Sequence, residues 1–356
     1  MACKRQESNL SALLFGVEFI CGLMRLDFGS MQILESKSYQ DRCAPVELTI
    51  AIPTWNREEE LRSQLEKIAQ VFGSRIEVIV SDNGSKDATW KMLEEEVSRN
   101  RLMIRCLRNR TNLGCDANYL RVLEAASGEW TWLIGDDDRL DFACFHSHLM
   151  PLLSLATTNL ILFADKDGPA TPESAVIKIS GETFFEASFD HLGDRILWLS
   201  RSICRTLPAI KHLGWAYKHG MGYLHSYSFI YGKLFADSGL EMIFAKDLFL
   251  YDPYDAHRWD LYEANSGAWR TNLLIFKQHK KLVRARERRI RSHPLFYSTK
   301  LRIQEDAPLG RSFLFVIREL PLNYRLKILL QYLRMASRRR SARRLRSASE
   351  SLPYHY

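Results

Sequence analysis

The sequence lacks the glycine-rich loops that bind nucleotide phosphates in two large classes of α/β enzymes. No GxGxxG motif follows a predicted strand, and no GxxxxGK[ST] motif is present. The first motif places the pyrophosphate of a dinucleotide at a helix N-terminus, and the second surrounds the phosphates of a nucleoside triphosphate. Dinucleotide-dependent dehydrogenases and P-loop NTPases are therefore excluded.

Paired cysteines are also missing. The chain of 356 residues has seven cysteines, an odd number, and none of them forms a CxxC pair. Disulfide frameworks and zinc sites are built from paired or closely spaced cysteines, so neither is expected here. The pattern is typical of a protein in a reducing compartment such as the cytosol.

No apolar run is long enough to cross a bilayer. Residues 10–24 are largely apolar, but Glu18 interrupts them, and a spanning helix needs about 20 apolar residues. No small-residue cleavage site clearly follows, so a signal peptide is not favoured. We expect residues 1–45 to be an N-terminal appendage that is poorly ordered or not native, with Met31 as an alternative start.

Positive charge is concentrated near the C-terminus. Residues 284–356 carry 18 Lys and Arg against 5 Asp and Glu, whereas residues 1–283 carry 32 against 37. Within the basic part, leucines are spaced to lie on one face of a helix, with basic residues on the remaining surface. These leucines are Leu322, Leu326, Leu329, Leu330 and Leu333. We expect residues 291–356 to form a basic helical extension.

The body of the chain alternates between strand and helix patterns. Residues 58–72 carry apolar side chains at helical spacing between two β-rich runs, and similar alternation continues along the chain. Strands are expected at residues 47–53, 75–81, 102–107 and 159–164, and in the run that begins at Glu129. This order predicts an α/β fold with a mostly parallel sheet flanked by helices. Further along, we expect a helix over residues 182–203 and a strand over residues 223–231.

Carboxylates follow two of the predicted strands. Asp82 follows the strand at 75–81, and Asp136, Asp137 and Asp138 follow the run EWTWLIG. Because the carboxyl ends of parallel strands meet at one edge of a sheet, we expect these acids to lie together. Three adjacent carboxylates repel one another, which favours a bound divalent cation over a solvated acidic turn. A cation there can bridge the two phosphates of a nucleotide diphosphate and stabilise it as a leaving group.

Three longer motifs follow one another in the body of the chain. They are IPTWNR at 52–57, VSDNGSKDAT at 80–89, and NLGCDANYLRVLEAASGEWTWLIGDDD at 112–138. With this order and spacing, residues 46–140 resemble the inverting glycosyltransferases of family two, which have the GT-A nucleotide-diphospho-sugar transferase fold. The third motif is most similar to the abequosyltransferase-like subgroup, whose members build bacterial surface polysaccharides. The resemblance implies a GT-A domain over residues 46–290, with a nucleotide-binding half (46–165) and an acceptor half (166–290).

The resemblance implies roles for the polar residues that match these motifs. Pro53, Thr54 and Asn56 would line the nucleotide-sugar pocket, and Asp82 would meet the base or the ribose. Asn56 and Ser85 are also expected to cap the helices that follow them. Asn112 is assigned to the same pocket. For Asn112 and for Asn118, we slightly favour helix and loop capping as the explanation.

The three consecutive aspartates would hold the diphosphate and its cation, Mg²⁺ or Mn²⁺. The resemblance implies that Asp136 lies near the ribose, that Asp137 is the principal metal ligand, and that Asp138 lies beside the metal or the acceptor. Many relatives have an aspartate where this chain has Gly135. That departure leaves open which two of the three acids form the working pair.

Inversion at the anomeric carbon needs one base that takes the proton of the acceptor hydroxyl. The resemblance implies a carboxylate near the start of a later helix, where Asp252, Asp255 and Asp260 are candidates beside His257. We predict Asp255, because it opens the helical pattern. A solvated helix face would explain each of these acids as well.

The basic extension is consistent with three interpretations. A basic amphipathic helix can lie on an anionic membrane, with its leucines in the lipid and its arginines at the phosphates. An arginine cluster can also bind nucleic acid, but no interleaved aromatics and no nucleic-acid module accompany it. Packing of the helix on the body is the third interpretation. We favour the membrane, because it suits a lipid-linked acceptor.

The sequence therefore predicts a metal-dependent inverting glycosyltransferase, cytoplasmic and peripheral on the inner face of the cell membrane. It would act on a nucleotide-sugar donor and a glycan acceptor, in bacterial surface polysaccharide synthesis. One alternative is a metal-dependent nucleotidyltransferase, which also uses carboxylates on a parallel sheet. The other is a non-catalytic membrane- or nucleic-acid-binding protein with a degenerate transferase body.

Overall fold

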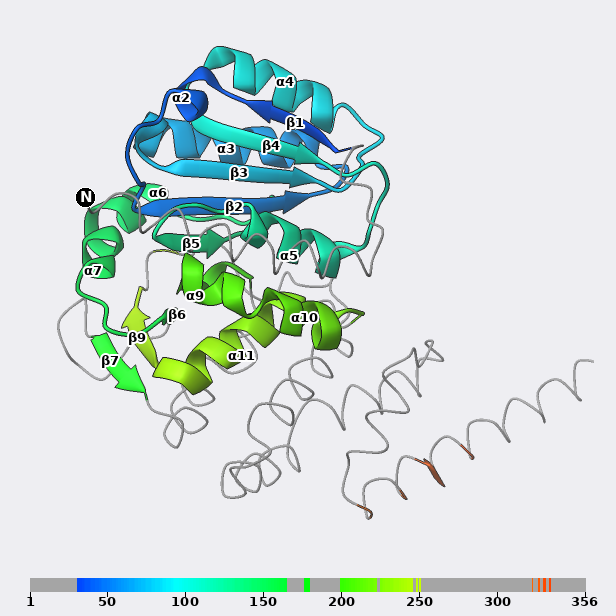
Figure 1. Ribbon diagram of the computed structural model, residues 1–356, viewed down its shortest axis with the longest axis vertical. Helices are drawn as coiled ribbons and strands as arrows, with labels where there is room; N and C mark the ends of the chain where they lie inside the picture. The colour runs from blue at the N-terminus through cyan, green and yellow to red at the C-terminus, as the bar shows by residue number, and fades with distance from the viewer. Residues whose placement is uncertain are drawn as a thin grey trace, which may run out of the picture.

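The computed structural model describes residues 31–164, 176–179, 199–222, 225–245, 248 and 250, together with the five leucines of the C-terminal extension. Within these residues the centre of the molecule is a nine-stranded sheet with the order β1-β4-β3-β2-β5-β8-β6-β9-β7 (Figure 1). Helices cover both of its faces. The predicted α/β class with a helix-flanked sheet is confirmed.

The strands and helices have the following bounds. The strands are β1 (Gln32–Glu35), β2 (Leu48–Thr54), β3 (Glu77–Asp82), β4 (Met103–Arg108), β5 (Trp130–Leu133), β6 (Leu160–Ala164), β7 (Val176–Ile179), β8 (Ser202–Arg205) and β9 (Leu240–Phe244). The helices are α2 (Lys37–Gln40), α3 (Glu58–Phe72), α4 (Thr89–Arg99), α5 (Cys115–Glu124), α6 (Phe142–Cys144), α7 (Met150–Leu153), α9 (Thr206–Lys211), α10 (Leu213–Gly220) and α11 (Ser226–Ser238). A π-helical turn, Phe145–Leu149, joins α6 to α7.

One half of the sheet, β4-β3-β2-β5, is parallel throughout. Every residue of β2 and β3 is buried, because helices cover both faces. Successive side chains of a strand point to opposite faces, so Ile50 and Ile52 pack in the core beneath α3, α4 and α6. Ala51, between them, packs in the second core beneath α5, α10 and α11. The strict alternation holds β2 and β3 in register.

The other half of the sheet is mixed. β8 is antiparallel to both β5 and β6, β9 is parallel to β6, and β7 is antiparallel to β9. The predicted helix over 182–203 is wrong at its end, because β8 begins at Ser202. The predicted strand over 223–231 is also wrong, because α11 begins at Ser226. The aromatic residues of α11 favour a strand locally, but in the helix they pack in the same core as α5 and β6.

Part of the expected N-terminal appendage belongs to the fold. β1 pairs antiparallel with β4 and forms the edge of the sheet. Ser36 then caps α2, and its hydroxyl also donates to the carbonyl of Leu102 at 2.8 Å. The expectation of an appendage that is poorly ordered or not native does not fit β1 and α2, which belong to the sheet edge. Residues 1–30 lie outside the described part of the chain.

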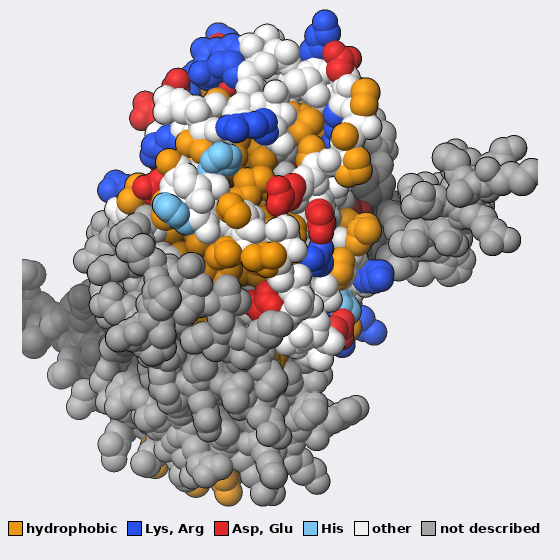
Figure 2. Space-filling model, turned by 90° about the vertical axis from the view of Figure 1, so that its left-hand side faces the viewer, with side chains coloured by type: hydrophobic (Ala, Val, Ile, Leu, Met, Phe, Trp, Pro, Cys, Tyr) orange, Lys and Arg blue, Asp and Glu red, His pale blue; other side chains and the backbone are white. Residues whose placement is uncertain are grey.

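The two ends of the parallel strands differ in surface character. Figure 2 views the molecule from the side where these strands begin, and hydrophobic side chains gather there among basic and acidic ones. Leu155, just after α7, is 73% exposed. The strands end on the opposite side of the sheet (Figure 1). Thr54 is the last residue of β2, and Asp82 is the last residue of β3.

The described leucines of the C-terminal extension are helical, as the spacing predicted. Leu322 is 70% exposed, and the other four are between 47% and 54% exposed. Among the described residues, no helix has the length and apolar character needed to cross a membrane.

Candidate active site

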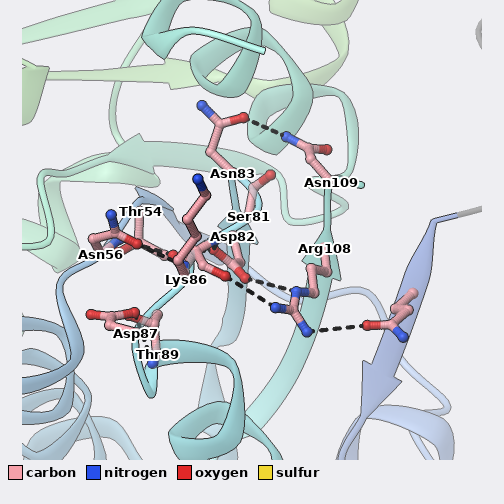
Figure 3. Close-up of polar contacts among 12 residues, drawn as sticks. Thr54, Asn56, Ser81, Asp82, Asn83, Lys86, Asp87, Thr89, Arg108 and Asn109 are labelled. Atoms are coloured by element: carbon pink, nitrogen blue, oxygen red, sulfur yellow. Dashed lines mark hydrogen bonds and ion pairs between the residues drawn. The ribbon is translucent and has the colours of Figure 1, made fainter. Parts of the chain in front are cut away.

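The carboxyl ends of three neighbouring strands bring residues from separate motifs together. In the sheet register, Thr54 at the end of β2 pairs with Asp82 at the end of β3, and Asp82 pairs with Arg108 at the end of β4. Figure 3 shows this edge with the loops that follow the strands. The predicted juxtaposition of strand-end residues is present, although Arg108 was not among the predicted residues.

Asp136 is held directly by the predicted residue Thr54. The Thr54 hydroxyl donates to Asp136 Oδ2 at 2.7 Å, which joins the end of β2 to the loop after β5. Burial raises the pKa of Asp136 to about 7, the Thr54 hydrogen bond opposes that shift, and the charge of Asp137 adds to it. The positive charges and hydrogen-bond donors around the Asp136 carboxyl therefore do not fully compensate for its burial. Pro53, the neighbour of Thr54, is buried in β2.

Asp137 faces a cation that the sequence predictions missed. Arg57 lies with its Nη2 3.8 Å from Asp137 Oδ2, while its Nη1 donates to Glu60 at 3.0 Å. The Asp137 side chain is 34% exposed, so it retains access to solvent and to ligands. Arg57 belongs to the motif IPTWNR, and this membership is the one signal that could have pointed to it.

Asp138 is folded back onto its own loop. Its Oδ2 accepts a hydrogen bond from the backbone N of Gly135 at 2.7 Å. A Cβ atom at position 135 would lie 3.1 Å from that same oxygen and 3.3 Å from Asp137 Oδ1. The carboxyl of Asp138 therefore occupies the space beside Gly135 that a side chain at 135 would need. This leaves Asp136 and Asp137 as the two acids that are directed away from the loop backbone.

Asp82 is fully buried at the end of β3. Its Oδ1 accepts hydrogen bonds from the backbone N of Ser85 at 2.9 Å and from the Ser85 hydroxyl at 2.5 Å, which is the Asx-turn arrangement. Its Oδ2 makes an ion pair with Arg108 Nε at 3.3 Å (Figure 3) and has no hydrogen bond among the described residues. Burial raises the pKa of Asp82, and the Ser85 hydrogen bonds and Arg108 oppose that shift.

The loops after β2 and β3 are joined by Asn56, which does not cap α3 as expected. Asn56 has a positive φ of 54°, its backbone N donates to Ser85 Oγ at 2.9 Å, and its side chain accepts from Lys86 N at 2.8 Å. α3 begins after Arg57 and α4 begins at Thr89, so the predicted capping by Asn56 and Ser85 is wrong. The side chains that could cap the two helices connect the loops instead.

Four asparagines form an amide network under this edge. Asn83 donates to Asn112 at 2.9 Å and accepts from Asn109 at 3.0 Å. Asn118, on α5, accepts from Ser81 and donates to the backbone carbonyl of Ser81. Asn112, predicted in the nucleotide-sugar pocket, accepts from the backbone N of Gly114 at 2.8 Å, as in the alternative capping interpretation. The network itself was not predicted, and Asn112 is the one predicted pocket residue among its four asparagines.

The residues at the edge offer two carboxylates for a divalent cation. No group of three Asp, Glu, His or Cys side chains in the described part of the chain is arranged to hold a metal ion. Mg²⁺ is commonly bound by one or two carboxylates together with substrate phosphates, and not by a protein cage. Asp136, with its raised pKa, and Asp137, with its exposed side chain, fit that mode of binding. The predicted base Asp255 lies outside the described residues.

Comparison with known proteins identifies the segment that carries this edge. Residues 49–154 match the model of glycosyl transferase family 2. The family-two segment runs from β2 through α7 and contains Thr54, Asp82 and the three aspartates. The predicted family resemblance is thus confirmed over this segment, and it agrees with the expected GT-A type of fold.

Curated relatives match about a quarter of the chain. The abequosyltransferase RfbV of Salmonella typhimurium is 37% identical over 95 residues, which are 26% of this chain and 28% of RfbV. An uncharacterized protein of Mycobacterium tuberculosis is 36% identical over 92 residues, 26% of this chain and 27% of its own length. The matches therefore span less than a third of each relative. Among solved structures, Staphylococcus aureus TarS (residues 1–349) is similar with a TM-score of 0.48 and 15% identity, over 82% of this chain and 81% of that one.

Proposed function

We propose that this protein is an inverting glycosyltransferase that moves a sugar from a nucleotide-sugar donor to a glycan acceptor. The observation that carries the proposal is the contact between Thr54 and Asp136 at 2.7 Å, inside the family-two segment. It places an under-compensated carboxylate at the edge where parallel sheets bind their ligands. Arg57 and Asp137 lie at the same place.

Each residue at the edge has a part in donor binding under this proposal. Asp82, held by Ser85 and Arg108, presents a fixed carboxylate to the base or the ribose. Asp136, fixed by Thr54, lies at the ribose side of the diphosphate, and Asp137 would hold a divalent cation, Mg²⁺ or Mn²⁺. When bound, the cation neutralises charge on the diphosphate as it leaves. Arg57, already beside Asp137, adds a second positive charge at the diphosphate.

The Asp138 carboxyl supports the loop in this scheme. The family resemblance implied that Asp138 lies beside the metal or the acceptor, but its Oδ2 accepts a hydrogen bond from the backbone N of Gly135. We propose that Asp136 and Asp137 form the working pair, with Asp138 fixing the turn that presents them.

The acceptor side of the reaction rests on Asp255, which remains a prediction. It would take the acceptor proton while the hydroxyl oxygen attacks the anomeric carbon from the face opposite the diphosphate. Asp255→Asn should abolish transfer and leave donor binding intact. Turnover at the wild-type rate in that variant would remove Asp255 as the base.

The C-terminal leucines support a lipid-linked acceptor and a place on the inner membrane face. They are helical and exposed, in a stretch of the sequence rich in Lys and Arg. We propose that this helix binds an anionic membrane, where its leucines enter the lipid and its basic side chains meet phosphates. A chain that ends at Pro321 should no longer bind phosphatidylglycerol vesicles. Unchanged binding would contradict the membrane role but not the transferase activity.

The activity is tested by following the products of a panel of donors. The full chain is incubated with UDP-, GDP-, dTDP- and CDP-hexoses in Mg²⁺ or Mn²⁺. A glycosyltransferase releases a nucleoside diphosphate, and slow hydrolysis of the donor releases it even without the acceptor. A nucleotidyltransferase exchanges inorganic pyrophosphate instead. Pyrophosphate exchange would replace the proposal by the nucleotidyltransferase alternative, and the absence of both reactions would favour a non-catalytic protein.

A further inference from the structure

The two helices that follow β8 form one surface helix with a buried and an exposed face. Only His212 separates α9 from α10, and its backbone stays in the helical region, with φ −99° and ψ 0°. The buried positions are three and four residues apart, as one face of a helix requires. They are Thr206, Ala209, Leu213, Ala216 and Gly220. The apolar side chains among them pack in the core shared with α5 and α11.

The exposed face combines apolar and basic side chains. Its positions are also four and three residues apart, and they are Leu207, Lys211, Gly214, Lys218 and Met221, which together we call the α9–α10 outer face. Leu207 is 73% exposed and Met221 is 39% exposed, and they lie at its two ends. Between them, Lys211 and Lys218 make no hydrogen bond or ion pair with another described residue. Both lysines are therefore available to a partner.

An aromatic residue and a third lysine lie beside this face. The half-buried ring of Trp215 packs on Phe229 of α11 with centroids 5.7 Å apart, and Lys233 Nζ lies 5.0 Å from the centroid of Trp215. Across α9, α10 and α11, three lysines stand against one acid, Asp237, which contacts His212 at 2.8 Å. This surface is therefore positively charged and should attract an anionic partner.

We propose that the α9–α10 outer face is a contact surface for an anionic lipid membrane. Leu207 and Met221 enter the lipid, and Lys211 and Lys218 meet the lipid phosphates, as in an amphipathic helix that lies in the membrane interface. Trp215 suits this depth, because indole rings are favoured at the level of the headgroups. The contact is additional to the one proposed for the C-terminal helix and does not depend on it.

Two other kinds of partner fit this face less well. A twofold contact with a second copy would present the same surface to itself, so the lysines of one copy would face those of the other. Nucleic acid would suit the lysines, because its affinity comes mainly from phosphate contacts. The exposed aliphatic side chains of Leu207 and Met221 would find no apolar partner there, whereas a membrane accommodates both kinds of side chain.

One end of the outer face lies beside the candidate active site. Gly222, the neighbour of Met221, donates from its backbone N to Asp116 Oδ2 in the first turn of α5 at 2.8 Å. Asn118, on the same helix, donates to the carbonyl of Thr54 at 3.4 Å. A membrane on the outer face would thus lie close to the edge that binds the donor. If the proposed transferase function holds, this orientation brings a lipid-linked acceptor to that edge.

The test is sedimentation of the full chain with phosphatidylglycerol vesicles, with phosphatidylcholine vesicles as the neutral reference. The double variant Lys211→Gln/Lys218→Gln should bind phosphatidylglycerol about 25-fold more weakly, because each lysine near an anionic surface contributes about fivefold. The matched control is Lys67→Gln/Lys91→Gln. Its two lysines are exposed on α3 and α4, which pack in the core on the opposite face of the sheet. The control should keep the wild-type affinity.

Leu207→Ala tests the apolar part of the contact. It should lower the affinity for phosphatidylglycerol vesicles roughly fivefold, because less apolar surface is buried in the lipid. Leu155→Ala is its matched control, since Leu155 is also 73% exposed but follows α7, which packs in the opposite core. That control should bind as the wild type does. This pair keeps the inference testable if the double lysine variant folds poorly.

The outcomes separate this inference from the proposed function. If the lysine variant and Leu207→Ala bind vesicles as their controls do, the outer face is not the membrane contact, while the C-terminal helix and the transferase stand. A wild type that binds no phosphatidylglycerol vesicles contradicts both membrane contacts. Vesicle binding unchanged in the lysine variant, with weaker binding to an RNA or DNA oligonucleotide, would assign the face to nucleic acid and overturn the inference. Donor turnover without vesicles tests the transferase separately, and it should stay at the wild-type value in all of these variants.

Discussion

The two ends of β3 carry buried carboxylates that are held in different ways. Glu77, the first residue of the strand, is fully buried and accepts hydrogen bonds from Arg42 and from Thr49 Oγ1 at 2.5 Å. The backbone N and the hydroxyl of Ser127 donate to it as well, at 2.7 Å and 2.5 Å. Both Glu77 oxygens therefore accept hydrogen bonds, and one of the donors, Arg42, is charged.

Asp82, at the other end of β3, has less support. It is equally buried, but the hydrogen bonds to its carboxyl come from Ser85 alone among the described residues, and its Oδ2 has only the ion pair with Arg108. Asp136 nearby has the Thr54 hydrogen bond and a pKa raised to about 7. Buried polar groups are normally satisfied within the fold. Asp82 and Asp136 have few hydrogen-bond donors for buried acids, which indicates a ligand at that edge. Glu77 has donors on both oxygens, which indicates a role in stability.

The comparison predicts its largest effect on catalysis at Asp137. Asp137→Asn should lower donor turnover on the order of 100-fold or more, because the cation site loses several kcal/mol of stabilisation. The variant should keep the thermal stability of the wild type without ligand. The Asp137 side chain is partly exposed, and removal of its charge relieves repulsion from Asp136. Release of nucleoside diphosphate measures the first expectation, and a thermal melt measures the second.

Asp141→Asn provides the matched control for that change. Asp141 caps α6 through a hydrogen bond from Cys144 N at 2.8 Å, and Asn is about as good a cap as Asp. The variant removes one charge four residues along the same loop and should keep wild-type turnover. If both variants lost activity equally, the effect would belong to the charge of the loop and not to Asp137.

At the other edge the expected effect is on stability. Glu77→Gln should lower the free energy of unfolding by roughly 2–4 kcal/mol, because Arg42 loses its charged partner and the buried donors lose part of theirs. Urea denaturation measures this loss, and donor affinity of the folded variant should stay unchanged. Glu66→Gln, which breaks an exposed pair with Arg101, should cost less than about 1 kcal/mol. If Glu77→Gln lost more activity than its unfolded fraction explains, Glu77 would also serve the reaction, and the two ends of β3 would not differ as proposed.

The smallest predicted effect is at Thr54. Thr54→Val keeps the shape of a buried side chain but removes the hydrogen bond to Asp136, so donor affinity should fall about tenfold. Thr54→Ser keeps the hydroxyl and should bind the donor nearly as the wild type does. A titration calorimeter measures both affinities. Equal affinity in the Val variant would mean that Asp136 is oriented without Thr54.

The parallel half of the fold could be read from the sequence because local and tertiary preferences agree there. β2 and β3 are continuous apolar runs, and such runs are what a strand covered on both faces requires. Acids placed at the ends of β3 and β5 were expected to meet at one edge, which predicted that Asp82 and Asp136 lie in the same region. Thr54 was assigned to that region by the family resemblance.

The remaining features depend on contacts that no local pattern specifies. Residues 223–231 were predicted as a strand because aromatic residues such as Tyr227, Phe229 and Tyr231 favour strands locally, whereas Ser226 to Ser238 form α11. Arg57 and Arg108 look like ordinary surface residues until the fold places them beside Asp137 and Asp82. Asn56 was misassigned because a residue that can cap a helix can equally bond a neighbouring loop.

The central claim is that the carboxyl edge of the parallel half binds a nucleotide diphosphate together with a cation. Thermal melts of the wild type, Asp137→Asn and Glu77→Gln with nucleoside diphosphates and Mn²⁺ or Mg²⁺ test it most directly. A ligand at about 100 times its Kd should add about 2.7 kcal/mol to stability. We predict such a cation-dependent rise for at least one nucleotide in the wild type and in Glu77→Gln, and its loss in Asp137→Asn. No rise with any nucleotide, or an equal rise in Asp137→Asn, would contradict the claim.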